Sequence, residues 1–231
     1  TNETDIWTFV AELQSKIDQD VEILPVYKKT LYSTPNDPQA NNLWYLKWWN
    51  GVHAYRAWDQ FAERKLNYVK VGIVDDGYYV EHEDLKISSA VPAWVGGGHG
   101  THVAWLVWAL TNNNSWIASA ARNSGNIQIK WYNYRFGQWD NDGSSNIMSL
   151  VAQAVQDGAK VINMSRWWGW YSSADAQIFQ AAYNMWVVLI AAAGNEWASQ
   201  PWYPARYPWV ISVGATTSAW TLASFSNKWA D

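Results

Sequence analysis

Short apolar runs alternate with longer helical patterns along most of the chain, and this alternation constrains the fold more than any other feature. Apolar runs rich in β-branched residues occur at residues 69–74, 127–132, 160–164, 186–191 and 210–213. Helical patterns occur at residues 41–61, 99–110, 145–156 and 174–185. Strands that are apolar throughout and are separated by helices indicate a mostly parallel sheet with helices on both faces. The sequence therefore predicts an α/β fold of this kind.

The N-terminal part of the chain has a different pattern. Residues 5–18 have helical spacing, and residues 21–27 are typical of a short strand. Residues 33–38, Ser-Thr-Pro-Asn-Asp-Pro, combine two prolines with turn formers and indicate a linker. We therefore expect two parts, residues 1–35 and residues 36–231, the second of which holds the sheet.

Composition narrows the classes of partner. The chain has no cysteine, a net charge of −4 and no long basic run, which argues against disulfides and against a nucleic-acid surface. No apolar segment reaches the roughly 18 residues of a membrane-spanning helix, and the start of the chain lacks the features of a signal peptide. We expect a soluble protein, or the processed part of a secreted one, that binds small molecules or peptides.

Asp75 follows the apolar run 69–74 directly and precedes Gly77. A carboxylate at the carboxyl end of a parallel strand is well placed to orient a histidine by accepting its ring N–H. A turn aspartate that caps a loop is the alternative. Asp76 beside it leaves the assignment between the two carboxylates open on spacing alone.

His99 stands at the start of a predicted helix, behind three glycines. There the helix dipole disfavours the imidazolium and favours a neutral ring that accepts a proton as a general base. His102 lies three residues on, so a zinc site on one helix face is an alternative, although no His-Glu-x-x-His pattern supports it. A core or capping role is the other interpretation of His102.

Asn195 follows the apolar run 186–191 after three small residues, the last of which is Gly194. A side-chain amide held there can donate a hydrogen bond to an oxyanion. A left-handed turn residue is the alternative interpretation.

Four stretches combine these residues in a characteristic order. They are Val-Gly-Ile-Val-Asp75-Asp-Gly, Gly98-His99-Gly-Thr-His-Val-Ala, Val161-Ile-Asn-Met-Ser165 and Ala-Ala-Ala-Gly194-Asn195-Glu. Together they resemble the subtilisin-like serine proteases, the subtilases. The resemblance extends from about residue 36 to the last residue. It implies an incomplete subtilisin-like catalytic domain over residues 36–231, truncated at its C-terminal side, and a tail of the family's propeptide over residues 1–35.

The resemblance also implies roles for individual residues. Asp75 and His99 match the aspartate and histidine of the catalytic triad, and Asn195 matches the asparagine of the oxyanion hole. The implied substrate-binding residues are Ser165, Arg166, Trp167 and Gly194. Asp84 matches the acidic ligand of the family's structural Ca²⁺ site, although the loop 112–117, which would hold the other ligands, departs from the family's spacing.

The resemblance implies a secreted monomeric endopeptidase that acts on peptides or proteins and binds its own propeptide, with no nucleic-acid or membrane partner. The family's nucleophilic serine lies in a Gly-Thr-Ser-Met-Ala motif that this chain does not contain. We therefore expect that the chain alone does not hydrolyse peptides. The alternatives are a serine supplied by a second chain, or an inactive relative or engineered fragment that binds peptides or glycans through exposed aromatic side chains.

Tryptophan is unusually abundant, with 20 residues against 14 glycines. Four of them stand where the resemblance leads us to expect glycine: Trp105, Trp167, Trp186 and Trp197. An indole at such a position should either clash with its neighbours or force a positive φ on a bulky residue. We expect several changes of this kind together to exceed the ~5–15 kcal/mol by which a domain is stable.

Overall fold

The computed structural model describes residues 8, 12, 34–47, 51–61, 67–79, 81–85, 98–122, 127–134 and 144–228. The chain divides into two compact units, Thr1–Ser33 and Thr34–Asp231. The helix predicted at residues 5–18 and the strand predicted at 21–27 lie outside the described residues, apart from the helical Thr8 and Glu12. The assignment of residues 1–35 to a propeptide stays a prediction. The sheet and the candidate site belong to the second unit.

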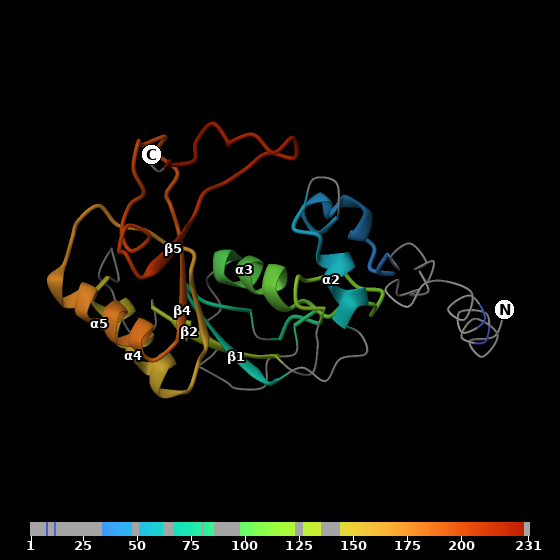
Figure 1. Ribbon diagram of the computed structural model, residues 1–231, viewed down its shortest axis with the longest axis horizontal. Coiled ribbons are helices and arrows are strands. Elements are labelled where there is room, and N and C mark those ends of the chain that lie inside the picture. Colours follow the sequence, from blue (N-terminus) through green and yellow to red (C-terminus); the bar gives the residue numbers. More distant parts are fainter. Residues whose placement is uncertain are drawn as a thin grey trace. The chain divides into compact units, whose positions relative to one another are not determined.

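Five parallel strands form the sheet in the order β2-β1-β3-β4-β5 (Figure 1). The strands are β1 (Val69–Asp75), β2 (Ile127–Asn133), β3 (Val161–Met164), β4 (Val188–Ala192) and β5 (Val210–Val213). Each of the five apolar runs of the sequence therefore contains a strand, and the predicted parallel α/β fold is confirmed.

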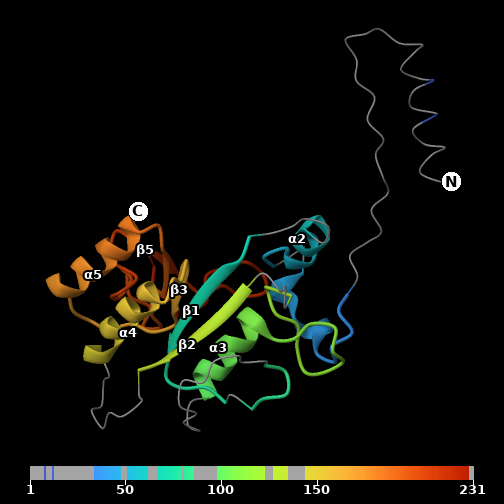
Figure 2. The same cartoon turned by 90° about the horizontal axis from the view of Figure 1, so that it is seen from below.

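Helices lie on both faces of the sheet: α3 (Gly98–Trp108) on one, and α4 (Ser144–Gln156) with α5 (Ser173–Asn184) on the other (Figure 2). The alternation along β1 produces this arrangement. Val71 and Ile73 pack in the cluster that includes α3, whereas Val74 packs in the cluster that includes α4. Among the described residues, no helix is long and apolar enough to cross a bilayer.

The β4–β5 end of the sheet is covered less completely than the β1–β2 end. Val210 is buried in the cluster that contains α5, but Ile211 and Val213 are 54% and 50% exposed. Val188 at the start of β4 is 43% exposed. Among the described residues, α3 therefore covers its face only beside the first strands and leaves an apolar strip at β4 and β5.

The single helix predicted over residues 41–61 is wrong. The segment forms two 3-10 turns, Ala40–Asn42 and Trp44–Leu46, and a later helix, α2 (Ala54–Phe61). Gly51 lies so close to Tyr45 that a Cβ at residue 51 would be 2.3 Å from the Tyr45 carbonyl oxygen, which is incompatible with one continuous helix. The positive φ of 57° at His53 then precedes α2.

Two of the four tryptophans at expected glycine positions adopt a positive φ, 62° at Trp186 and 56° at Trp197. The left-handed conformation at Trp186 also explains why β4 begins at Val188 and not at residue 186 as predicted. Trp105 lies inside α3 without a positive φ and stacks on Trp116, with ring centroids 5.7 Å apart. Trp167 also has no positive φ.

Candidate functional site

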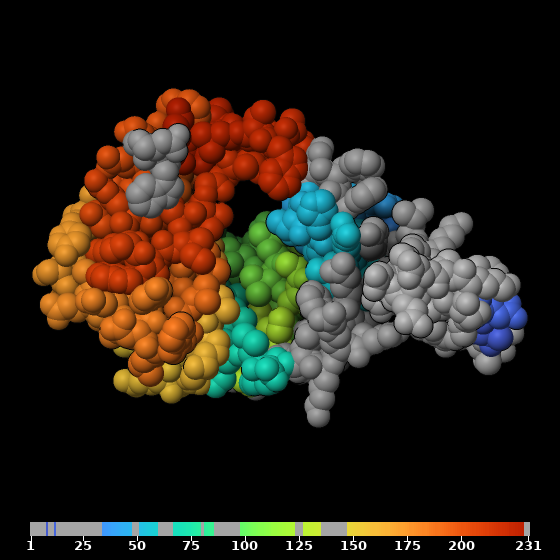
Figure 3. Space-filling view, in the orientation of Figure 1, coloured from blue at the N-terminus to red at the C-terminus, as the bar shows by residue number. Residues whose placement is uncertain are grey.

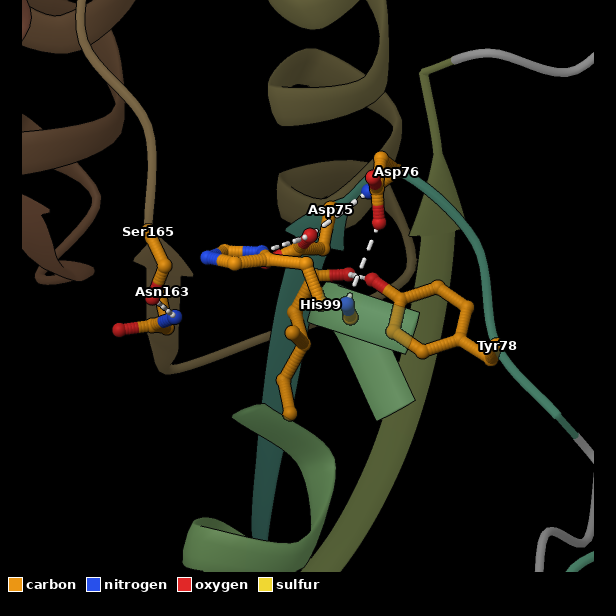
Figure 4. A network of polar contacts seen from close by, with 8 residues as sticks. Asp75, Asp76, Tyr78, His99, Asn163 and Ser165 are labelled. Carbon is orange, nitrogen blue, oxygen red and sulfur yellow. Dashed lines mark hydrogen bonds and ion pairs between the residues drawn. The ribbon is translucent and has the colours of Figure 1, made fainter. Parts of the chain in front are cut away.

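The structure brings Asp75 and His99 into direct contact (Figure 4). Asp75 is the last residue of β1 and is 1% exposed, and His99 lies in the first turn of α3. The Nδ1 atom of His99 lies 2.7 Å from Oδ1 of Asp75, which also accepts the backbone N–H of Asp76. The spacing of the sequence left open whether Asp75 or Asp76 contacts the histidine. The structure shows that Asp75 bonds the imidazole.

A close approach of backbone to backbone positions the start of α3. A Cβ at residue 100 would lie 2.3 Å from the carbonyl oxygen of Gly77, so glycine is required where the helix passes the turn after β1. The N–H of Gly100 donates to Oδ1 of Asp76 at 3.2 Å, which ties this turn to the helix N-terminus. The second carboxylate therefore supports the geometry of the pair.

The pKa values of the pair are shifted by burial and by their mutual hydrogen bond. Burial raises the pKa of Asp75, and the hydrogen bond with His99 opposes that rise. The same hydrogen bond raises the pKa of His99 and outweighs the opposing effect of its partial burial. The effect of Asp75 on the His99 ring is thus opposite in sign to the effect predicted for the helix dipole. The other ring nitrogen of His99 points towards the side where Ser165 and Asn163 lie (Figure 4).

Ligand atoms of Asp75, Asp76 and His99 lie within 4.8 Å of one another, and in the described part of the chain no other three acidic or histidine side chains group in this way. The hydrogen bond within this group joins His99 directly to a carboxylate oxygen. His102 is not a member of the group, and its ring instead lies 6.0 Å from that of Trp105. The structure therefore does not place His102 among the side chains that could share a metal ion with His99, as the predicted alternative of a zinc site requires.

Asn195 lies in an exposed loop that follows β4. A buried residue far along the sequence, Asn227, forms hydrogen bonds that hold this loop. Oδ1 of Asn227 accepts the N–H groups of Glu196 and Ala198, both at 2.9 Å, and its Nδ2 donates to the Ala193 carbonyl oxygen at 3.0 Å. Asn227 is 2% exposed. Sequence reasoning assigned no role to Asn227.

The three predicted substrate-binding residues after β3 point in different directions. Oγ of Ser165 accepts a hydrogen bond from Nδ2 of Asn163 at 2.9 Å, and the Arg166 guanidinium lies 4.5 Å from the ring centre of Tyr134. Nε1 of Trp167 donates to Oε1 of Glu196 at 2.9 Å. The segment after β3 is thereby joined to the loop after β4, which holds Asn195 and Gly194.

Gly194 has a φ of 113°, which glycine adopts without strain.

The space-filling view shows the surface hollowed between the green atoms of α3 and the red segment after β5 (Figure 3).

Asp84 lies apart from these residues, in a group of buried oxygen atoms. It is 0% exposed, and its two carboxylate oxygens accept Nδ2 of Asn113 at 2.8 Å and the N–H of Ile117 at 3.3 Å. Asp37, 3% exposed, accepts the N–H groups of Asn112 and Asn113. Two buried carboxylates beside one loop fit the oxygen ligands that Ca²⁺ takes, and burial raises the pKa of Asp84.

Comparison with known proteins places this arrangement in a family. The model of the subtilase family matches residues 67–230. Subtilisin DY of Bacillus licheniformis is 39% identical over 178 residues, which cover 71% of this chain and 62% of that protein. Thermitase of Thermoactinomyces vulgaris is 33% identical over 206 residues, which cover 84% of this chain and 69% of thermitase.

Solved structures show the same likeness. A protease of Pseudoalteromonas arctica superposes with a TM-score of 0.70 at 26% identity, over 84% of this chain and 69% of that one. The subtilisin-like protease Apa1 of a Pseudoalteromonas species superposes with a TM-score of 0.58 at 28% identity, over 69% of this chain and 38% of that one. By its sequence and by its fold, the chain belongs to the subtilase family.

Proposed function

We propose that the protein to which this chain belongs is a serine endopeptidase of the subtilisin type. The contact between Asp75 and His99 is the observation that carries the proposal. A buried carboxylate that holds one imidazole nitrogen leaves the other to take a proton from a hydroxyl nucleophile. In this mechanism Asp75 orients the ring and stabilises the imidazolium that forms.

The loop after β4 supplies the second catalytic element. Asn195 is exposed, and its neighbours on the loop are fixed by Asn227. Its side-chain amide donates to the oxyanion that develops on the scissile carbonyl group, a contribution of roughly 3–4 kcal/mol where such a donor has been removed. The substrate is a peptide or protein that runs along the backbone of Ser165, Arg166 and Trp167.

We further propose that this chain does not contain its nucleophile. Among the described residues, no serine hydroxyl forms a hydrogen bond with His99, and the chain has no Gly-Thr-Ser-Met-Ala motif. The expected result for the purified chain is no peptide hydrolysis above background. Addition of a peptide segment that contains this motif is expected to produce hydrolysis that His99→Ala abolishes. Turnover by the chain alone, lost in His99→Ala, would contradict the missing nucleophile and support the triad.

Ca²⁺ at the group of Asp84 and Asp37 is a separate proposal. A bound cation there would compensate two buried carboxylates and hold the loop 112–117. The unfolding temperature is expected to rise with added Ca²⁺ and to fall with a chelator in the unmodified chain, but to respond to neither in Asp84→Asn. A response that is unchanged in Asp84→Asn would place the ion elsewhere. A secreted monomer that binds its own propeptide completes the proposal.

A peptide- or glycan-binding module is the second candidate function. Its support is a set of exposed indoles: Trp186 is 88% exposed, Trp170 53% and Trp197 52%. Exposed aromatic rings of this kind are frequent in recognition surfaces. Titration of the chain with peptides and with oligosaccharides separates the two functions. A binding module is favoured if Asp75→Asn and His99→Ala still bind the ligand and if the chain supplied with the serine-containing segment does not hydrolyse peptides.

A further inference from the structure

One indole lies between the segment after β3 and the loop after β4. A Cβ at residue 169 would lie 3.1 Å from Cζ3 of Trp202, and a Cβ at residue 194 would lie 2.5 Å from Cδ1 of the same ring. The six-membered ring therefore faces Gly169, and the five-membered ring faces Gly194. Trp202 fills the space between the two segments that the proposed function assigns to the substrate.

Backbone pairing holds Trp202 in this position. Its N–H donates to the Ala193 carbonyl oxygen at 2.9 Å, and the following residue, Tyr203, forms an antiparallel bridge with Trp168. The chain at residues 202–203 is thus bonded to both segments at once. The ring cannot leave the space without loss of these hydrogen bonds or a change of its own rotamer.

A second indole is bonded to the carboxylate beside this space, because Oε2 of Glu196 would lie 2.7 Å from a Cβ at residue 194. Trp167 donates to Oε1 of Glu196, while Oε2 of Glu196 accepts the N–H of Asn195 at 2.9 Å and Nδ2 of Asn227 at 3.1 Å. One carboxylate therefore joins the substrate segment, the loop and the buried Asn227. Nε1 of Trp202 is buried and has no hydrogen-bond partner among the described residues.

We propose that the Trp202 ring fills the space that a side chain of a bound peptide would take, and that the Trp167–Glu196 hydrogen bond closes that space. The peptide-binding surface then accepts only glycine or alanine at the peptide residue that faces Trp202. The proposal rests on the proposed function, because it names the class of peptide that the same surface takes. A phenylalanine at this point of the peptide would need the space that the Trp202 ring fills and the gap that the Trp167–Glu196 hydrogen bond bridges.

The first test is a cavity experiment with indole as the probe. Trp202→Gly removes the ring between Gly169 and Gly194, and a dry cavity of matching shape binds the lost aromatic group. The variant is expected to bind indole saturably, and its unfolding temperature is expected to rise with indole concentration. The matched control is Trp170→Gly, which removes a half-exposed indole nearby and is expected to show neither effect. Absence of indole binding by folded Trp202→Gly would overturn the proposal.

The second test uses two peptides that differ only by alanine or phenylalanine at the last residue. By calorimetry the unmodified chain is expected to bind the alanine peptide at least ~10-fold more tightly, and Trp202→Gly is expected to reverse this preference, since burial of a large apolar side chain is worth about 1.5–3 kcal/mol. Trp167→Ala, which removes only a half-buried ring, is expected to raise affinity for the phenylalanine peptide and leave the fold intact.

The outcomes separate this proposal from the proposed function. Equal binding of both peptides by all forms overturns the occupied site and leaves peptide recognition standing. Indole binding by Trp202→Gly with no peptide binding by any form supports the occupied site and contradicts peptide recognition. If Trp202→Gly does not fold, with or without indole, the test is the affinity of Trp167→Ala for the phenylalanine peptide. A higher affinity than that of the unmodified chain supports the proposal, and an unchanged affinity overturns it.

Discussion

The two halves of the candidate site are built in opposite ways. At Asp75 and His99 the chain uses glycine for a close approach of backbone to backbone, and two carboxylates fix the helix and its histidine. After β3 and β4, the Trp202 indole lies between the two segments, and Trp197, in the loop after β4, has a positive φ. The comparison teaches that the geometry of the Asp75–His99 pair can be intact beside a proposed substrate surface into which the chain's own indole is packed.

The largest expected effect breaks the first half. In Gly100→Ala the new Cβ would lie 2.3 Å from the Gly77 carbonyl oxygen, and we expect a loss of about 3 kcal/mol or more in the free energy of unfolding, since backbone cannot yield as a side chain does. Urea denaturation measures this loss. Gly98→Ala is the matched control, because nothing lies within 4 Å of a Cβ at residue 98. Equal stability of the two variants would show that α3 does not depend on this contact.

The next effect breaks the second half. Asn227→Ala removes a buried amide that bonds Glu196, Ala198 and Ala193, and we expect a loss of about 2–3 kcal/mol because these groups are left unpaired. Hydrogen exchange at the amides of residues 196 and 198 is expected to accelerate, with the amides of β1 unaffected below global unfolding. The exposed Asn42, whose side chain bonds Gln39 alone among the described residues, provides a control as Asn42→Ala. Unchanged exchange at residues 196 and 198 would be evidence against the role of Asn227.

A smaller effect of opposite sign sharpens the comparison. Trp186 is 88% exposed and has a φ of 62°, so Trp186→Gly is expected to stabilise the fold by about 1 kcal/mol through relief of backbone strain. Trp170→Gly, at an exposed tryptophan without a positive φ, is expected to be neutral or destabilising. Thermal unfolding compares the two. A destabilised Trp186→Gly would mean that the ring contributes more than its backbone costs.

The smallest effect concerns proton binding. Because the pKa of His99 is raised in the fold, its pair with Asp75 stabilises the protein below the ordinary histidine pKa of 6.5, and this stabilisation is lost as pH rises through the folded-state value. Asp75→Asn is expected to lower the pKa of His99 in an NMR titration and to flatten this part of the pH dependence of stability. A His99 titration that is the same in both proteins would remove Asp75 as its partner.

Much of the fold could be predicted from the sequence because each strand is a short apolar run between helical patterns, as residues 69–74 illustrate. The pairing of Asp75 with His99 was also predictable, since both side chains lie at one end of the sheet. The break at Gly51 could not be foreseen, because it depends on contact with Tyr45. A helical spacing of apolar residues carries no sign of such a contact.

Other features depend on residues that are distant in sequence. Asn227 fixes a loop more than two dozen residues before it, and no local pattern marks a buried amide of this kind. Trp105 was expected to clash or to take a positive φ, but it stacks on Trp116 inside a regular helix. The site filled by Trp202 also required knowledge of which segments lie on either side of it.

The uncovered strip of β4 and β5 has a practical consequence for work with the protein. Ile211 and Val213 are half-exposed, and no charged residue occurs between Arg206 and Lys228. An uncharged strand at the end of a sheet offers its free backbone groups to any other strand. We therefore expect the proposed monomer to self-associate non-specifically through this edge in concentrated solution, and we expect hydrophobic dyes to bind there even when every molecule is fully folded.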